Sequence, residues 1–314
     1  MVKILTIIPA RSGSKGIPNK NIRLFQNRPL IAWSIQQALD SDYREQMKII
    51  VSTDSEQYRE IAINYGAEAP FIRPSEISED HSSDFECIHH CVEWLKENQD
   101  YQPDIIVQLR PTQPLRKIRD INQAISLFME KRKQGYDSLR SVVKIDKSAY
   151  KMYTITGNVG SSGDSIFLNP IASLDNIEEP YNQCRQVLPD TYLHNGYIDI
   201  LNSSILSSNT ISGSKILPYV MEPECTHDID TMKDWELAQI EVNNSKSDKE
   251  EKKKISKQRK NEKKHIREVK KIEKMNKLKE KNDKKQKKII ERNIKKANKM
   301  IEKKEKKKKK KKKK

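Results

Sequence analysis

Short apolar runs alternate with helical patterns over the first 200 residues, and this alternation limits the fold more than any other feature. Between the apolar runs, apolar side chains recur every three or four positions, which is typical of amphipathic helices. The alternation predicts an α/β fold with a mostly parallel sheet covered on both faces. The strand-like runs are Ile4–Pro9, Lys48–Ser52, Ile105–Leu109, Ser138–Lys144 and Gly196–Leu201, and the helical patterns are Ile31–Leu39, Ser55–Tyr65, Ser83–Asn98 and Ile118–Arg132.

In open sheets of this kind, ligands bind beyond the carboxyl ends of the strands. Four loops of this sequence occupy such positions and carry polar side chains: Pro9–Asn21, Ser52–Ser55, Arg110–Arg116 and Asp228–Thr231. We expect any site to be built from them.

The first loop combines glycine with cations. Gly13 and Gly16 permit tight turns, and Arg11, Lys15 and Lys20 lie within the same short stretch. Backbone N–H groups and cations that face one point suit a polyphosphate. The loop matches neither GxxxxGK[ST] nor GxGxxG, and an ordinary turn with solvated charges is the alternative.

The second and third loops are less specific. Asp54 follows a strand and either holds a hydroxyl or caps the next helix, and capping is the favoured interpretation. In the third loop two prolines stiffen the chain, while Arg110 and Arg116 either reach an acidic ligand or lie on the surface.

The fourth loop holds two carboxylates one residue apart, Asp228 and Asp230. On a strand these side chains would share a face, which suits Mg²⁺, or Mn²⁺ in its place. A helix cap or a turn is the alternative for so short a pattern.

Charge divides the chain at about residue 244. Residues 245–314 hold 36 of the 61 Lys and Arg residues and 11 of the 44 Asp and Glu residues, a net charge of +25, and residues 1–244 carry −8. We expect a single α/β domain over 1–244 and a low-complexity tail over 245–314, disordered or partly helical. Such a tail binds polyanions non-specifically, acts as a nuclear import signal or contacts an anionic membrane. A low-complexity extension with no partner of its own is the alternative.

Four cysteines form no CxxC pair, and neither a leader-like apolar segment nor an apolar run long enough to span a membrane is visible. These features favour a reducing, cytoplasmic location without structural disulfides. Cys87, His90 and Cys91 recur at helical spacing, which fits either a zinc site or, as we favour, small apolar side chains facing a core.

Taken together, the loops resemble the acylneuraminate cytidylyltransferases, the CMP-sialic acid synthetase family. The resemblance covers roughly residues 1–240 and leaves out the tail. It lies in an ordered series of motifs: Ala10-Arg11, Ser14-Lys15-Gly16, Pro18, Lys20-Asn21, Ser52-Thr53-Asp54, Arg73-Pro74, Pro111-Thr112, Pro114-Leu115-Arg116, Asn195-Gly196 and Asp228-Ile229-Asp230-Thr231.

The resemblance implies a three-layer Rossmann-like nucleotidyltransferase fold and Mg²⁺-dependent transfer of CMP from CTP to the anomeric hydroxyl of an acidic 2-keto sugar. It further implies that Asp228 and Asp230 hold the metal. Catalytic cations would be Arg11, Lys15 and Lys20; nucleotide-binding residues would be Ala10, Ser14, Gly16, Asn21, Arg73 and the segment Asp80–Ser83; sugar-binding residues would include Asn195.

The sugar side departs from the family pattern. Arg110 stands where the family has an uncharged Gln, Asp199 stands where it has an aromatic residue, and the family's Arg is absent at Leu193 and His194. Either Arg110 replaces that missing partner from another direction, or the substrate differs. Sialic acid, a related nonulosonic acid, an eight-carbon 2-keto acid and an unrelated sugar remain open as acceptors.

The irregular segment 148–193 corresponds to a lid or an arm. In the similar family an inserted arm reaches a second subunit, so the resemblance implies a homodimer in which Lys151 and Arg185 approach the partner's sugar. A surface excursion in which these two residues have no ligand role is the alternative. A different class of function also stays open: a non-catalytic nucleotide-binding relative tethered by its basic tail.

Overall fold

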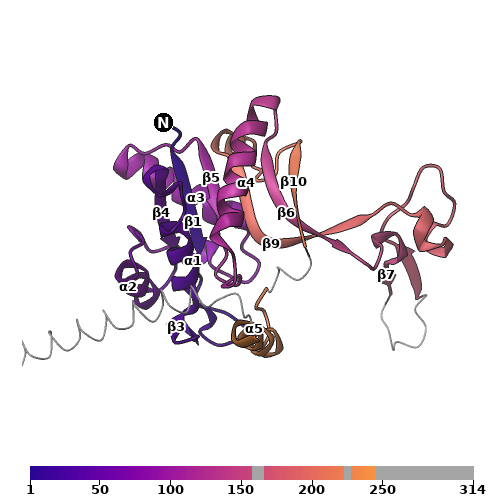
Figure 1. Ribbon diagram of the computed structural model, residues 1–314, viewed down its shortest axis with the longest axis horizontal. Helices are drawn as coiled ribbons and strands as arrows, with labels where there is room; N and C mark the ends of the chain where they lie inside the picture. The colour runs from indigo at the N-terminus through magenta and orange to yellow at the C-terminus, as the bar shows by residue number, and fades with distance from the viewer. Residues whose placement is uncertain (158–165, 223–227, 245–314) are drawn as a thin grey trace, which may run out of the picture. The chain divides into compact units, whose positions relative to one another are not determined.

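The computed structural model describes residues 1–157, 166–222 and 228–244 (Figure 1). The chain divides into two units, 1–244 and 245–314. Our expectation for residues 245–314, disordered or partly helical, therefore lies outside the described residues.

Within the described residues, six strands form the main sheet in the order β10-β6-β9-β5-β1-β4. β1 pairs in parallel with β4 and β5, and β6 pairs in parallel with β10, whereas β9 is antiparallel to both of its neighbours. The sheet is thus mostly parallel, as expected. The strands are β1 Ile4–Pro9, β4 Met47–Ser52, β5 Ile105–Gln108, β6 Ser138–Ile145, β9 Thr191–Asn202 and β10 Ile216–Met221.

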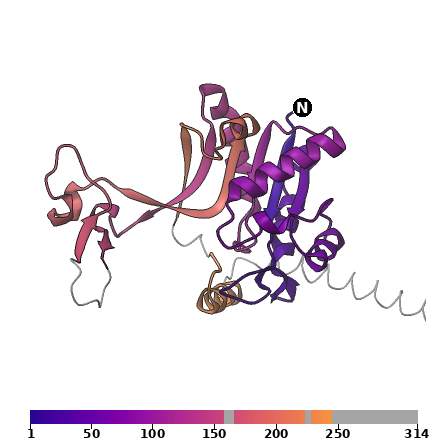
Figure 2. The same ribbon diagram turned by 180° about the vertical axis from the view of Figure 1, so that it is seen from behind.

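Helices cover both faces of this sheet. On one face, α1 (Leu30–Leu39), α2 (Glu56–Asn64) and α4 (Ile118–Lys131) share a buried core with Ile4 and Ile8 of β1. On the other face, α3 (Asp84–Gln99) packs on Leu5 and Ile7 of the same strand (Figure 2). A strand buried on both sides explains the uninterrupted apolar run in the sequence.

Short polar side chains cap the starts of α2 and α3. Ser55 caps α2 by accepting from the Tyr58 N–H group. Ser83 and Glu86 form a reciprocal capping box at the start of α3, an arrangement that contributes about 1 kcal/mol. α3 therefore begins at a fixed residue, and this fixes the direction in which Asp84 points.

A third, smaller core lies beside the carboxyl ends of the strands. There Phe25 of the short β2–β3 hairpin packs edge-on against Trp235 of α5, with Ile17 and Ile229 in the same cluster. This core ties the first loop to the segment just before α5. The elements are β2 (Leu24–Phe25), β3 (Arg28–Pro29) and α5 (Met232–Asn244).

β6 and β9 continue past the sheet as a two-stranded ribbon that ends in the pair Ile145 and Thr191. The excursion between them contains the antiparallel pair β7 (Tyr153–Thr156) and β8 (Phe167–Pro170), and we call residues 146–190 the arm. Its residues 158–165 lie outside the described part. Among the described residues, no helix combines the length and apolar content needed to cross a bilayer.

Candidate functional site

The first loop leaves the carboxyl end of β1 and is held in place by neighbouring backbone. The Ala10 N–H group donates to the Ser52 carbonyl at 2.9 Å, and the buried Asn21 amide donates to the Arg11 carbonyl at 2.9 Å. Asp54 accepts from both the Ser12 N–H group and the Ser12 hydroxyl, at 2.7 and 2.8 Å. Our capping interpretation of Asp54 was wrong, because the adjacent Ser55 caps α2 and leaves Asp54 to hold a hydroxyl of this loop.

The first loop meets the two-aspartate loop across a sequence separation of 209 positions. The Lys20 ammonium donates to the Ile229 carbonyl and to Asp230 Oδ1, both at 2.9 Å. A Cβ atom on Gly16 would collide with the Asp230 carbonyl oxygen. Since Gly16 does not have a positive φ, its role is this close approach rather than the turn that the sequence suggested.

The third loop joins the same place. The Ile229 N–H group donates to the Thr112 carbonyl at 2.9 Å. Burial raises the pKa of Asp228, a Thr112 hydrogen bond works against this, and the nearby Asp230 carboxylate raises the pKa further. Three loops that are far apart in sequence therefore converge on one pair of carboxylates.

Asp228 and Asp230 do not lie on a strand. They belong to the irregular segment before α5, where Thr231 and Asp234 cap the helix reciprocally. Asp230 is 70% exposed. Within the described ranges, no group of three or more His, Cys, Asp or Glu side chains surrounds a metal position. Asp228 and Asp230 remain the candidate ligands because Mg²⁺ can take its other ligands from waters and phosphate oxygens.

Arg11, Lys15 and Asp80 form a group that we call the loop cluster. Arg11 Nη1 lies 2.7 Å from Asp80 Oδ1, and Lys15 pairs with the other carboxylate oxygen. Hydrogen bonds from Lys15 and then Arg11 lower the pKa of Asp80. These groups are exposed, Lys15 to 81%, so the cations of the loop are paired with a carboxylate that solvent can reach.

A cavity of about 210 Å³ lies between these loops and the start of α3. Arg73 lines it from below while its Nε donates to the Ser78 hydroxyl at 3.0 Å. The expected site residues among its lining are Arg11, Ser14, Lys20, Asn21, Arg73, Ser83 and Arg110. A larger hollow of about 630 Å³ lies around Met1 and Met47, at the amino ends of β1 and β4, where parallel sheets do not bind their ligands.

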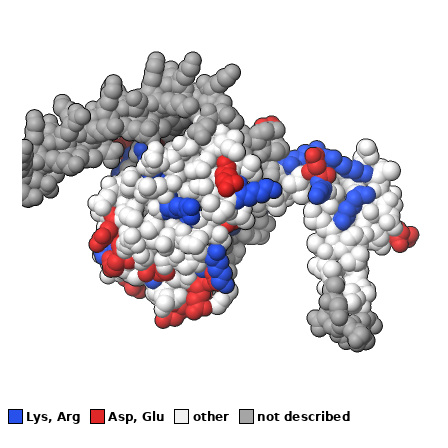
Figure 3. Space-filling view, turned by 90° about the horizontal axis from the view of Figure 1, so that it is seen from below, with Lys and Arg blue, Asp and Glu red and all other residues white. Residues whose placement is uncertain are grey.

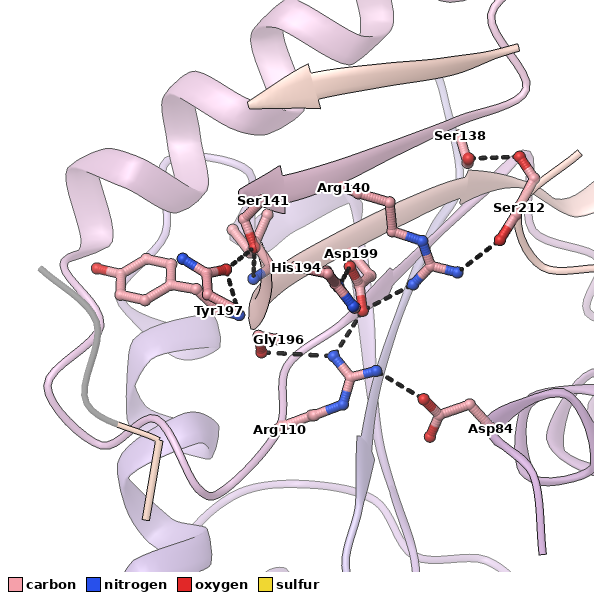
Figure 4. Close-up of polar contacts among 12 residues, drawn as sticks. Asp84, Arg110, Ser138, Arg140, Ser141, His194, Gly196, Tyr197, Asp199 and Ser212 are labelled. Atoms are coloured by element: carbon pink, nitrogen blue, oxygen red, sulfur yellow. Dashed lines mark hydrogen bonds and ion pairs between the residues drawn. The ribbon is translucent and has the colours of Figure 1, made fainter. Parts of the chain in front are cut away.

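Arg110 extends from the end of β5 into a group that we call the arginine cluster: Arg110, Arg140, His194 and Asp199 (Figure 4). Arg110 Nη1 lies 2.5 Å from Asp199 Oδ2, and Arg140 Nη1 lies 2.8 Å from the same oxygen. His194 contacts Asp199 Oδ1 at 2.7 Å. The two departures from the family pattern, Arg110 and Asp199, thus pair with one another.

Three expected sugar residues are not brought to the cavity. The buried Asn195 side chain accepts from the Ser141 hydroxyl at 2.6 Å and from the Tyr197 N–H group at 3.2 Å, so it serves the interior of the sheet. Lys151 lies in the arm, exposed, and Arg185 pairs there with Asp146 at 2.6 Å.

Arg116 also has a structural position, and both alternatives for it, reaching an acidic ligand and lying on the surface, were wrong. It is buried, and it donates to the Tyr197 carbonyl at 2.5 Å and to Gln37 at 2.6 Å. Burial lowers its pKa to about 10. By bonding β9 and α1 at once, Arg116 holds the third loop in place.

The cysteines behave as small apolar groups. Cys87 and Cys91 face the sheet from α3, and burial raises the pKa of both thiols. Among the described residues no zinc-like cluster includes them.

Sequence reasoning missed Asp84, Thr112 and Arg140 as neighbours of the cavity or of its arginine. Asp84 follows the capping serine directly and lines the cavity. Arg140 sits in an apolar strand, and a charged residue within such a run is a signal that was available from the sequence.

Comparisons with known proteins show what the chain is similar to. The chain matches the family described as Cytidylyltransferase over residues 5–297. It is 35% identical over 237 residues to the N-acylneuraminate cytidylyltransferase of Escherichia coli O18:K1:H7, covering 75% of this chain and 51% of that protein. It is 32% identical over 241 residues to the pseudaminic acid cytidylyltransferase of Campylobacter jejuni, covering 76% and 96%.

The chain therefore spans about half the length of the E. coli relative and nearly all of the C. jejuni one. Its fold is similar to the solved structure of a CMP:2-keto-3-deoxy-manno-octonic acid synthetase complexed with CTP. The TM-score is 0.53 at 17% identity, over 77% of this chain and 98% of that one. This likeness supports the three-layer fold.

Proposed function

This chain belongs to the cytidylyltransferase family, and we propose that it transfers CMP from CTP to the anomeric hydroxyl of an acidic 2-keto sugar. The hydroxyl oxygen attacks the α-phosphorus, the bond from that phosphorus to the bridging oxygen breaks, and pyrophosphate leaves. The hydroxyl proton passes to solvent. The names of the relatives make N-acylneuraminate and pseudaminic acid the first acceptors to test.

The observation that carries the proposal is the meeting of Lys20 with the two-aspartate loop. Nucleotidyl transfer depends on positioning and on neutralising phosphate charge more than on covalent help from the protein. Arg11, Lys15 and Lys20 supply that charge from the loop after β1, and Gly16 lets the backbone approach closely. Ala10, Ser14, Asn21, Arg73, Asp80 and Ser83 form the nucleotide side in this proposal.

Asp228 and Asp230 fit a Mg²⁺ ion, or Mn²⁺ in its place. Two carboxylates within a polar loop match an ion that keeps waters and takes its other ligands from phosphates. The neighbouring Asp230 carboxylate is one cause of the raised pKa of Asp228, and a bound cation would offset this repulsion between like charges. When bound, the ion supplies positive charge against the phosphate oxygens.

A homodimer is part of the proposal, because the described arm exposes many large apolar side chains. Ile155 is exposed to 56% and Leu168 to 59%, on the paired strands β7 and β8. In Figure 3 the charged side chains of the arm gather on its upper part, and the described part that hangs below them is mostly uncharged. Contiguous exposed apolar surface is typical of interfaces. In such a dimer, Lys151 and Arg185 serve the partner's acceptor site.

The dimer can be tested by complementation. Lys20→Ala and Arg185→Ala proteins are each expected to be weak. Subunits mixed after mild denaturation should recover activity, because some mixed dimers contain one site with both residues intact. No recovery, or a monomer by sedimentation, would contradict the shared site.

The central test is pyrophosphate release with CTP, ATP, GTP and UTP in parallel, each with N-acetylneuraminate, pseudaminic acid and 3-deoxy-manno-octulosonate. We expect release with CTP, with one of the acids and with Mg²⁺. Binding of CTP without release for any acceptor would favour the non-catalytic nucleotide-binding alternative.

A further inference from the structure

The arginine cluster has one fixed side and one open side, and the difference assigns a role to Arg110. Its guanidinium contacts two carboxylates with different nitrogens. Nη1 lies 2.5 Å from Asp199 Oδ2 and Nη2 lies 2.6 Å from Asp84 Oδ2 (Figure 4). The two partners come from different elements, β9 and the first turn of α3.

The Asp199 side is fixed. Asp199 is 1% exposed and receives Arg110, Arg140 and His194 together. Burial alone would raise the pKa of Asp199, but the His194 hydrogen bond and the two arginine charges outweigh it and hold the pKa well below its usual range. The Arg110 Nη1 group also lies 3.4 Å from the Gly196 carbonyl. With three partners and 1% exposure, the Asp199 carboxylate is not open to a ligand.

The Asp84 side is open. Asp84 is 36% exposed, and it lines the cavity together with Arg110 and Thr112. Its carboxylate shows that Nη2 can bind a carboxylate at this position in the cavity. The position also adjoins the N-terminus of a 16-residue helix, where an anion is favoured.

Charge balance permits an exchange here. Arg110 and Arg140 carry two positive charges, and Asp199 and Asp84 carry two negative ones. If a ligand carboxylate took the place of Asp84 on Nη2, the buried part of the cluster would remain neutral and Asp84 would turn toward water. Loss of Asp199 would instead leave Arg140 without its carboxylate partner and Arg110 with Asp84 alone.

We propose that Asp84 stands in for the carboxylate of the acceptor, which binds Arg110 Nη2 in its place, and that Asp199 is a positioning residue that aims the Arg110 fork at the cavity. This inference rests on the proposed function, since it names the group of the acidic acceptor that Arg110 recognises. The two departures from the family pattern, Arg110 and Asp199, then act together: Asp199 orients the arginine that binds the acceptor.

The test uses N-acetylneuraminate and its methyl ester as probes, which differ in the charge of the carboxyl group. Arg110→Gln should raise the KM for the acid at least about tenfold, as expected for a charge-assisted hydrogen bond, while the KM for the ester changes less than about twofold. Asp84→Asn should lower the KM for the acid, because a neutral amide competes less well. Arg119→Gln, an exposed arginine on α4, is the matched control.

A positioning role for Asp199 has its own readout. Asp199→Asn should raise the KM for the acid but not for the ester, and the double variant with Arg110→Gln should be no worse than Arg110→Gln alone. Each variant is first checked for an intact thermal transition.

Direct binding keeps the outcomes apart. Saturation-transfer NMR with the acid, in the presence of CTP and Ca²⁺, reports binding without turnover. Three outcomes would overturn the inference. Arg110→Gln could weaken binding of the acid and of the ester equally, Asp84→Asn could raise the KM for the acid, or neither probe could bind. A different result would overturn the proposed function instead. In that result CTP does not bind, while the acid binds every protein except Arg110→Gln.

Discussion

The loop cluster and the arginine cluster each gather cations around an aspartate, but they differ in their access to water. Asp80 and its partners Arg11 and Lys15 are exposed, whereas Asp199 is buried beneath α3. Exposed ion pairs contribute little to stability and are readily exchanged. Buried pairs are costly to break, because the remaining charge has no water to replace its partner. Burial therefore separates the charges that a ligand can claim from those that hold the sheet.

The sharpest test of this difference is the loss of each central aspartate. Asp199→Ala should lower the free energy of unfolding by about 3–5 kcal/mol, because Arg140 loses its carboxylate partner and Arg110 is left with Asp84, while both guanidinium groups stay largely shielded from water. Asp80→Ala should lower it by less than about 1 kcal/mol. Urea unfolding of the full chain measures both, and similar values for the two variants would remove the distinction.

A second test compares two cations of the first loop. Lys20 is held by two acceptors and is largely shielded, whereas Lys15 projects into solvent. Lys20→Ala should lower kcat about 100-fold, as for a preorganised group that stabilises developing charge. Lys15→Ala should lower kcat about tenfold or less. Single-turnover rates at saturating CTP give the comparison, and a larger loss at Lys15 would place the reacting phosphates nearer the outer end of the loop.

The two glycines of this loop form a matched pair. A Cβ at Gly16 meets the Asp230 carbonyl, and a Cβ at Gly13 meets nothing within 4 Å. Gly16→Ala should therefore lower kcat/KM for CTP about tenfold by separating the loops, a cost of about 1.4 kcal/mol. Gly13→Ala should change it less than about twofold. Equal effects would show that the loops adjust freely.

The sequence predicted the sheet well where strands are buried on both faces. β1 has the predicted bounds because every residue from Ile4 to Ile8 is apolar or buried. β10 was missed because it alternates exposed and buried positions and contains Pro218, which weakens a strand pattern. β9 was predicted too short, because its first residues are polar and pair with β6 in the ribbon to the arm.

The site, like the sheet, could be predicted only in part from the sequence. Loops at the carboxyl ends of strands had to meet, so the approach of Lys20 to the aspartates followed from topology. The partners of Arg110 could not be predicted from topology, because Asp84 and Asp199 lie 26 and 89 positions away and no motif relates them. Tertiary packing decided which arginine of the third loop faces the cavity, and it buried Arg116.

The pH dependence of stability offers a smaller test of the buried pair. The folded-state pKa of Asp199 lies below its unfolded value of about 3.9, so its stabilisation is complete above that value and is lost as the pH falls below it. The difference in the free energy of unfolding between wild type and Asp199→Asn should be constant above about pH 5. Below about pH 4 it should shrink by about 1.4 kcal/mol per unit.

Urea midpoints measured from pH 7 to pH 2.5 give this difference curve. Asp80→Asn is the control, and its curve should be nearly flat, because water screens the loop cluster. An advantage of wild type over Asp199→Asn that stays unchanged down to pH 2.5 would mean that this carboxylate titrates alike in both states.

The smallest expected effect comes from removing residues 245–314. The described elements that form the site end with α5 at Asn244, so truncation there should change kcat less than about twofold. Residues 245–314 carry a net charge of +25, and residues 1–244 carry −8. The full chain should therefore attract the anionic CTP more strongly at low salt than the truncated protein does. Its KM for CTP should then rise more steeply with salt than that of the truncated protein, as counterions screen the basic segment. Parallel salt series on both proteins measure this, and a collapse of kcat on truncation would place part of the catalytic machinery beyond Asn244.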